Sequence, residues 1–277
     1  MKKSEVRSQK SENKKQIIKK SFSVFLAVIF TQMVTTPNAF AMHISEGILP
    51  LNWALFWSVV AVPFVAWGLY RLKRQSTVDL SFKPLVGLMA AVVFIISCMP
   101  VPVPTAGTCS HPTGVAISAI LLGPAISVIV STVALLIQAL FLAHGGLSTL
   151  GANVVSMGIM GSFAGYLTFK ALRKITSHMP FFNENRKWRL AVPGFMAGLM
   201  ADWATYAMTS IELATGIRGD SEFLPLFVQI LIAFMPTQLP LGILEGAMTA
   251  GMVTLLYKKR PDILVKMRVL KPEEVTA

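Results

Sequence analysis

Long apolar segments separated by short polar loops are the feature that most constrains how this chain can fold. A helix needs about 20 residues to cross the roughly 30 Å hydrocarbon core of a bilayer, and most of the segments approach or exceed that length. Hydrophobic residues make up 54% of the 277 residues and charged residues only 14%, whereas soluble domains average about 25% charged residues. We therefore expect an all-α integral membrane protein. Its candidate spans are 52–70, 84–99, 112–143, 151–169, 190–211 and 227–257.

Lysine and arginine gather in a few segments between or after the apolar ones. The basic segments are 71–83, 170–189 and the tail 258–277, whereas the loops with at most one Lys or Arg are 100–111, 144–150 and 212–226. Cytoplasmic loops carry an excess of Lys and Arg, so we expect the basic segments in the cytoplasm and the other loops outside. Topology signals also account for the net charge of +12 without a nucleic-acid partner.

The apolar segment 112–143 is too long for a single crossing. Its 32 residues would form a helix of about 48 Å, and Gly123-Pro124 interrupts it. Both flanking loops are uncharged, so the chain should leave and return to the same face in two spans. The sequence therefore predicts about seven transmembrane helices, with the mature amino terminus outside and the carboxyl terminus in the cytoplasm.

The first 41 residues have the organisation of a cleavable signal peptide. Eight Lys or Arg residues precede an apolar core at 22–34, which is shorter than a normal span, and the segment closes with a small-residue A-F-A pattern ending at Ala41. Cleavage after Ala41 would remove 1–41 and leave a membrane domain over 42–257, followed by a basic tail over 258–277. The alternative is a retained signal anchor.

Cleavage after Ala41 would also create a chelating group, because Met42 would become the first residue and His43 the second. An α-amino group has a pKa near 8 and gives up its proton to a metal easily. The amide and imidazole nitrogens of His43 can close fused five- and six-membered chelate rings with that amine. Three nitrogens in one plane suit a divalent late transition metal. With an uncleaved signal, His43 would lie in an ordinary loop.

His111 is the second candidate ligand and directly precedes Pro112. Proline pushes the residue before it towards extended backbone and itself favours the first helical position. We therefore expect His111 at the external mouth of the span that begins at 112, with its ring free to turn inward. The alternative is a histidine that caps a helix or lies in a loop.

Four motifs taken together resemble the CbiM family, the substrate-capture (S) component of cobalt energy-coupling factor transporters. They are MHISEGILP, GTCSHPTG, AHGGLSTLGANVVSMGIMG and QLPLGILEG, and the resemblance runs from Met42 to about Tyr257. It implies that the amine of Met42, the amide and imidazole of His43 and the imidazole of His111 hold the metal. It also implies Co²⁺ as the transported substrate, supplied for cobalamin biosynthesis, with no permanently bound cofactor. Nickel-specific S components are close relatives, so Ni²⁺ is the alternative. Ser45 departs from the bulkier residue usual in the family but touches no ligand.

The partners follow from a missing motif and from the resemblance. The chain has no G-x-x-x-x-G-K-[ST] phosphate loop, so as an uphill transporter it needs a separate motor. The resemblance implies ABC-type ATPase subunits, a transmembrane coupling (T) subunit and a small accessory membrane protein, in a bacterial inner membrane. We therefore expect a transporter subunit and not an enzyme. The rival hypothesis is an intramembrane zinc metalloenzyme with Glu46 as its general base.

Several further polar residues accompany the two histidines. Glu46 either accepts a hydrogen bond from the His43 ring or places a charge near a helix start. His144, followed by two glycines, either orients a ligand or covers the site, or else has an ordinary loop role. Asn153, Gln138 and Gln238 either bind helices together or support the metal loop.

Two carboxyl groups, Asp202 and Glu245, fall within apolar spans. Ionisable groups in such positions are costly and usually face the protein interior. They serve either in a pathway or coupling role or as structural partners of nearby Thr, Gln or backbone groups, and we favour the structural reading.

Overall fold

The computed structural model describes residues 43–99, 101–103, 108–180, 182 and 187–276. The expected signal peptide, its cleavage point at Ala41 and the proposed ligand Met42 lie outside this part of the chain. The elements in chain order are α2 (Leu51–Val78), α3 (Phe82–Ser97), β1 (Val101–Val103), β2 (Thr108–Ser110), α4 (Val115–Leu122), α5 (Pro124–Phe141), α6 (Leu150–Asn153), the π-helix η1 (Val154–Gly161), α7 (Ser162–Thr176), α9 (Trp188–Ile217), α10 (Phe223–Lys259), α11 (Pro261–Lys266) and α12 (Glu273–Thr276).

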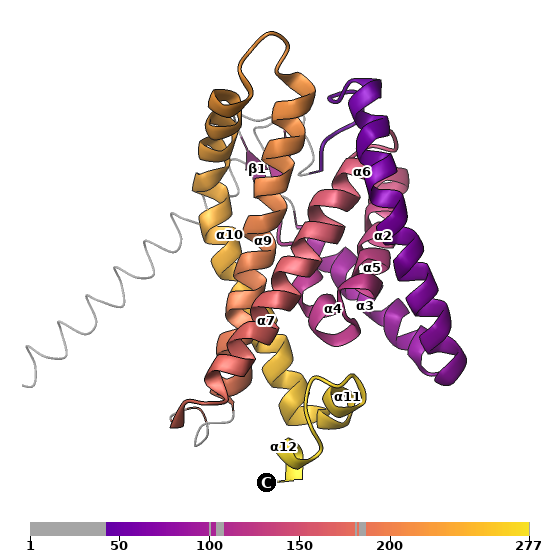
Figure 1. The fold of residues 1–277 in the computed structure, drawn as a ribbon, viewed down its shortest axis with the longest axis vertical. Helices are drawn as coiled ribbons and strands as arrows, with labels where there is room; N and C mark the ends of the chain where they lie inside the picture. The colour runs from indigo at the N-terminus through magenta and orange to yellow at the C-terminus, as the bar shows by residue number, and fades with distance from the viewer. Residues whose placement is uncertain (1–42, 100, 104–107, 181, 183–186, 277) are drawn as a thin grey trace, which may run out of the picture. The chain divides into compact units, whose positions relative to one another are not determined.

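The described residues are mainly helical, as expected, and each predicted span contains a helix (Figure 1). Four helical segments are long and apolar enough to cross a membrane, namely α2, α5, the continuous run α6–η1–α7 and α10. Helix α3 is shorter, at 16 residues. The small antiparallel hairpin of β1 and β2, which pairs Val101 with Ser110, was not predicted. It lies in the loop that leads to His111.

The predicted break at Gly123-Pro124 is confirmed, and the helix before it is short, as expected for the first of the two spans. Gly123 has a φ of 81°, a conformation that glycine adopts without steric cost, and Pro124 begins α5. With eight residues, α4 rises only about 12 Å and cannot cross a bilayer as a helix. All of its side chains are buried, so α4 is a half-helix inside the bundle and not a lipid-facing span.

Helix α9 continues past the predicted end of its span at residue 211. It ends at Ile217 and buries Glu212 completely, whereas we expected Glu212 in an external loop. In the sequence, a single carboxyl group at the end of an apolar segment predicts that a loop begins there. Here the packing of α9 against α10 and η1 extends the helix past it.

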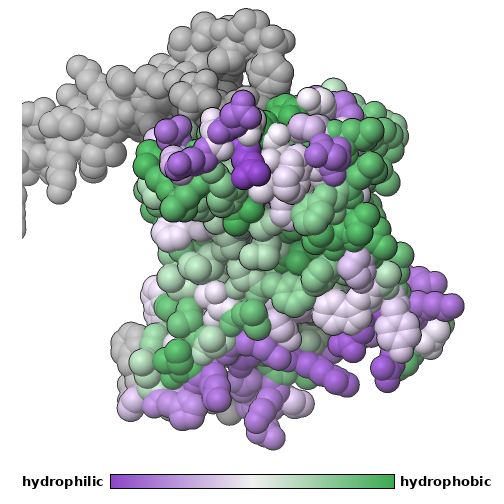
Figure 2. Space-filling view, turned by 45° about the horizontal axis from the view of Figure 1, so that its top comes forward, coloured by the Kyte–Doolittle hydropathy of each residue, from purple (hydrophilic) through white to green (hydrophobic). Residues whose placement is uncertain are grey.

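An apolar belt lies between two hydrophilic ends on the face of the protein drawn in Figure 2. Large hydrophobic side chains are exposed along α2 and α10, where a membrane would cover them. Those most exposed on these two helices include Leu55, Val59, Val62, Leu224, Ile232 and Ile243. This surface is what an integral membrane protein requires.

The tail after α10 packs onto one end of the bundle, seen at the bottom of Figure 1. Lys266 forms an ion pair of 2.6 Å with Asp79, and Glu274 pairs with Arg173 at 2.8 Å and with Arg189 at 3.2 Å. These pairs connect all three Lys- and Arg-rich segments. The segments that we expect in the cytoplasm therefore lie together, and we call this part of the molecule the basic end.

Candidate metal site

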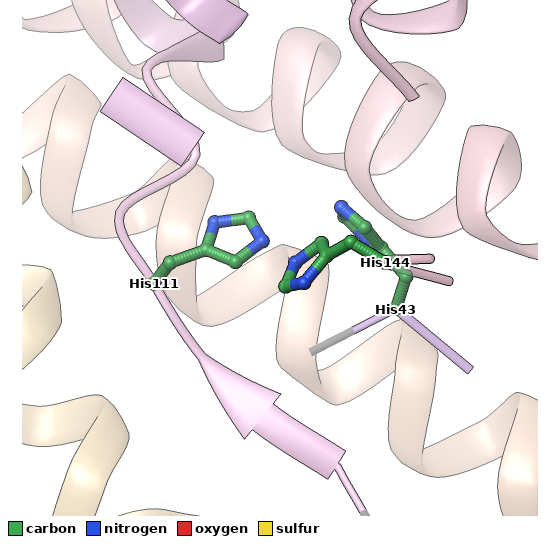
Figure 3. Close-up of side chains that lie close together, drawn as sticks. All are labelled: His43, His111 and His144. Carbon is green, nitrogen blue, oxygen red and sulfur yellow. The ribbon is translucent and has the colours of Figure 1, made fainter. Parts of the chain in front are cut away.

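Three histidines from separate parts of the chain converge inside the bundle (Figure 3). His43 precedes α2, His111 follows β2, and His144 follows α5. Their ring centroids are 4.9 to 5.3 Å apart, and one nitrogen of each ring lies within 4.8 Å of the others. Two nitrogens bound to one ion at about 2.1 Å are at most about 4.2 Å apart. Small rotations of the imidazoles are enough to reach that spacing, so the cluster can hold a metal ion.

A directional chain of hydrogen bonds sets the tautomer of His43. The Ser97 hydroxyl donates its one proton to the Phe94 carbonyl at 3.0 Å, so its oxygen accepts from the Gln138 amide nitrogen at 2.7 Å. The Gln138 oxygen therefore faces His43 and accepts from Nε2 at 2.9 Å. With Nε2 protonated, the lone pair of the neutral ring is on Nδ1. Nδ1 is the atom that closes a six-membered chelate ring with the backbone nitrogen of the same residue.

The backbone on either side of His111 is held by two side chains from distant helices. The Tyr206 hydroxyl accepts from the His111 amide and donates to its carbonyl, both at 3.3 Å. Both carboxyl oxygens of Glu245 accept hydrogen bonds from the two residues after Pro112: Thr113 N at 2.6 Å, Thr113 Oγ1 at 2.6 Å and Gly114 N at 3.1 Å. These bonds fix the loop that presents His111.

The ring of His111 is also fixed in one tautomer. Its Nδ1 lies 2.9 Å from the Pro112 carbonyl, which can only accept, so Nδ1 is the donor and Nε2 has the lone pair. The Nε2 side of the ring points towards the other two histidines in Figure 3. The lone pairs available to a metal are therefore on Nε2 of His111 and on Nδ1 of His43.

Burial keeps the three rings neutral. It lowers the pKa of His111 to about 3, helped by the charge of a protonated His144, and lowers the pKa of His144 to about 4. Burial, with repulsion from the other two rings, lowers the pKa of His43 well below its usual range. A metal binds only the neutral imidazole. The pocket therefore maintains the binding form well below neutral pH.

The segment that carries His43 is held by Asn153, the last residue of α6, and by two glycines before this helix. The Asn153 side chain accepts from the Ile44 amide at 2.8 Å and donates to the Ile44 carbonyl at 3.2 Å. Two glycines let this segment approach, because a Cβ on Gly145 would lie 2.9 Å from the His43 Cβ and one on Gly146 would clash with the backbone of Glu46. Asn153 and the glycines after His144 thus hold the segment that carries His43 in place, and a role of Asn153 in metal binding stays a prediction.

Glu46 does not contact the His43 ring. It is exposed, and its Oε2 accepts from the Ser148 amide at 3.1 Å. The role that we offered to Glu46 is taken by Gln138. For Glu245, the structural reading is confirmed, since its partners are a threonine and backbone amides. Sequence reasoning did not find Tyr206, because a tyrosine in an apolar helix carries no local sign of a partner 95 positions away.

Comparison with known proteins assigns the chain to a family. The family described as "Cobalt uptake substrate-specific transmembrane region", CbiM, matches residues 43–263. The chain belongs to the CbiM family. A cobalt transport protein CbiM of Geobacter sulfurreducens is 63% identical over 244 residues, covering 88% of this chain and 67% of that protein. One from Sorangium cellulosum is 54% identical over 230 residues, covering 83% and 97%.

A solved transition metal transporter has the same fold as this CbiM-family chain. It is 28% identical, superposes with a TM-score of 0.63, and the match covers 82% of this chain and 99% of the other. A truncated transition metal transporter is 26% identical with a TM-score of 0.60, covering 80% and 99%. The family match begins at His43 and includes both His111 and His144, so the whole histidine cluster lies within the shared region.

Proposed function

We propose that this chain is the substrate-capture subunit of a cobalt importer. Co²⁺ binds at the external end through the Met42 amine, the amide and Nδ1 of His43, and Nε2 of His111. We include His144 as a further ligand. One of its ring nitrogens lies within 4.8 Å of nitrogens of His43 and His111, and its Nε2 is buried and makes no hydrogen bond to any described residue. The relatives are cobalt transport proteins by name, which supports Co²⁺ as the substrate.

The single observation that carries the proposal is the protonation pattern of His43. A second-residue histidine chelates together with the amine and amide only through Nδ1, and the bonds from Phe94 through Ser97 and Gln138 leave the lone pair on that atom. A histidine that served only to pack the bundle would not need hydrogen bonds that keep its Nε2 protonated and its Nδ1 unprotonated. The same arrangement lowers the cost of ordering the ligand before the metal arrives.

The proposal includes the processing and topology of the chain. Signal peptidase cleaves after Ala41, the domain 42–257 crosses the inner membrane, and the tail 258–277 lies in the cytoplasm with the basic end. One of the seven proposed crossings consists of residues 112–114 followed by α4, which ends next to Gly123 at the basic end. ABC-type ATPase subunits, a T subunit and a small accessory membrane protein drive import, and the cobalt serves cobalamin biosynthesis.

The decisive experiment measures the amino terminus and the metal on the same sample. The full chain is expressed in a bacterial membrane and purified, its first residues are sequenced, and Co²⁺ binding is measured by calorimetry. We expect a mature protein that begins at Met42 and binds one Co²⁺. The Ala41→Lys variant, which blocks cleavage, should insert normally but bind no cobalt. Tight binding by a protein that retains residues upstream of Met42 would refute the chelate.

Nickel is the second candidate substrate, and the donor set is the reason. A site made of nitrogens with three donors in one plane suits Ni²⁺ as well, and the Irving–Williams order places Ni²⁺ above Co²⁺ in affinity. Competition calorimetry with both ions and uptake in cells separate the two. We expect uptake of Co²⁺ at limiting concentrations, and preferential uptake of Ni²⁺ would reassign the substrate.

The general base that the zinc-enzyme hypothesis requires, Glu46, is not part of the histidine cluster. Glu46 bonds to Ser148, and the histidine cluster contains no carboxyl group from the described residues. Hydrolytic chemistry at a metal needs a group that can take a proton from the bound water. We therefore propose a transporter subunit without catalytic activity, and turnover of any ester or peptide by the purified chain alone would contradict this.

A further inference from the structure

A cavity of about 810 Å³ opens at the basic end, apart from the histidine cluster. Its walls come from α2, α7, the C-terminal half of α4 and the turn after α11. Six cationic side chains and one carboxylate line it: Arg71, Arg74, Lys170, Arg173, Lys266, Arg268 and Asp79. Apolar side chains of α4, from Ile120 to Leu122, and Phe169 form part of the same surface. The cavity thus combines positive charge with an apolar wall.

Most of this positive charge is not neutralised by the protein. Asp79 pairs with Lys266, and Glu274 pairs with Arg173. The other four cations form no ion pair with any of the described residues, namely Arg71, Arg74, Lys170 and Arg268. The positive-inside preference accounts for basic loops, but it does not require that cations from three separate segments face one cavity. Like charges gathered in this way repel unless an anion lies between them.

The backbone of Arg268 gives a second, independent observation. Arg268 follows the last turn of α11 and has a φ of 57°, in the left-handed region where helices usually place glycine. A long side chain at this position strains the backbone, and such strain is typical of residues retained for function. The chain accepts the strain and gains a guanidinium group that lines the cavity.

We propose that this cavity binds a phosphate group, and that an anionic phospholipid of the membrane supplies it. Arginine is well suited to phosphate because its donors match two phosphate oxygens at once. The cationic side chains stand at the basic ends of the candidate spans α2 and α7, at the level of lipid headgroups, and the apolar wall fits the start of an acyl chain. Basic pockets between transmembrane helices on the cytoplasmic side bind such headgroups. The proposal depends on membrane insertion but not on the metal site.

The test compares two double variants with the same change in charge. Arg71→Gln/Arg74→Gln removes two cations of the cavity, and Lys258→Gln/Lys259→Gln removes two exposed cations at the end of α10 that do not line it. The purified full chain is placed in nanodiscs of phosphatidylcholine with or without phosphatidylglycerol. Native mass spectrometry then counts retained lipid, and thermal unfolding measures stabilisation. We expect lipid binding roughly tenfold or more weaker in the first variant and nearly unchanged in the second.

A second experiment distinguishes a lipid phosphate group from a soluble phosphate compound. Inorganic phosphate and ATP are added to the wild-type chain in phosphatidylcholine alone. We expect neither to reproduce the stabilisation by phosphatidylglycerol, and an equal effect of soluble phosphate would overturn the assignment to a lipid. Equal losses of phosphatidylglycerol binding in the two double variants would contradict the assignment of the lipid to this cavity. Such a result would mean that binding depends on the total positive charge and not on the cations of the cavity.

Arg268→Gly keeps the proposal testable if the double variant folds poorly. Glycine relieves the strained backbone, so the variant should unfold at the same or a higher temperature in phosphatidylcholine. It should nevertheless lose severalfold in phosphatidylglycerol binding. A variant that is less stable in neutral lipid, or that binds phosphatidylglycerol as well as the wild type, contradicts the role given to Arg268.

Discussion

Replacing Glu245 with glutamine tests how the His111 loop is held in place. Both oxygens of the Glu245 side chain act as acceptors, one for the Thr113 amide and the other for the Thr113 hydroxyl and the Gly114 amide. Glutamine keeps the size of the side chain but has only one acceptor oxygen. In either orientation of its amide, at least one backbone N–H of the loop faces an NH₂ group and loses its bond.

The expected cost follows from that lost bond. A buried donor left without a partner costs about 1 to 3 kcal/mol. If the metal binds only when the His111 loop is in its hydrogen-bonded conformation, this cost lowers the population of that conformation. The apparent affinity for the metal then falls by roughly 5- to 150-fold. The Tyr206 hydroxyl still forms its two hydrogen bonds with the backbone of His111. If these two bonds are enough to keep the loop in place, we expect the lower part of that range.

The assay is calorimetry with Co²⁺ on the purified chain, together with the visible absorption spectrum of the bound ion. Glu212→Gln is the matched control, because Glu212 is equally buried but makes no hydrogen bond to the loop. Thr113→Ala combined with Glu245→Gln should cost less than the sum of the single changes, since both remove the same contacts. Wild-type affinity and spectrum in Glu245→Gln, or strict additivity in the double variant, would refute the reasoning.

Three other predictions concern the histidine cluster. His43→Ala and His111→Ala should each abolish high-affinity Co²⁺ binding in calorimetry while the protein remains folded by thermal unfolding, and a variant that retains wild-type affinity removes that residue from the site. Gln138→Leu should weaken binding by roughly 5- to 10-fold, because about 1 kcal/mol that favours the Nδ1 lone pair of His43 is lost; unchanged affinity would argue against tautomer control. Acidification should destabilise the metal-free protein, because His111 has a pKa near 6.5 when unfolded and about 3 when buried. The unfolded state then takes up the proton first, so stability is full above pH 6.5 and falls by about 2 kcal/mol by pH 5. Thermal unfolding between pH 7 and 4.5 measures the fall, and a flat profile contradicts it.

Parts of this architecture could be predicted because their causes are local. The break at Gly123-Pro124 depends on two adjacent residues whose backbone preferences oppose a continuous helix, and the structure has it at that point. The basic segments were identified by counting charges. His43 and His111 were selected by their immediate neighbours, a small-residue pattern and a proline.

Other features could not be predicted because they depend on partners far away in the sequence. Glu46 was a plausible partner of His43 by proximity, yet Gln138, 95 positions away, takes that place. Glu245 supports a loop 132 positions earlier. Glu212 was expected in a loop because a carboxyl ends an apolar run, but helix packing buries it.

The sequence by itself determined that this chain belongs in a membrane and which segments are rich in positive charge. Hydropathy and charge act residue by residue, and the bilayer selects for them without reference to the rest of the fold. Only the tertiary structure decided that three histidines meet, which nitrogen of His43 and of His111 has the lone pair, and that cations from three segments share one cavity. Each of these depends on the direction of side chains in space, and that direction is set by packing between helices.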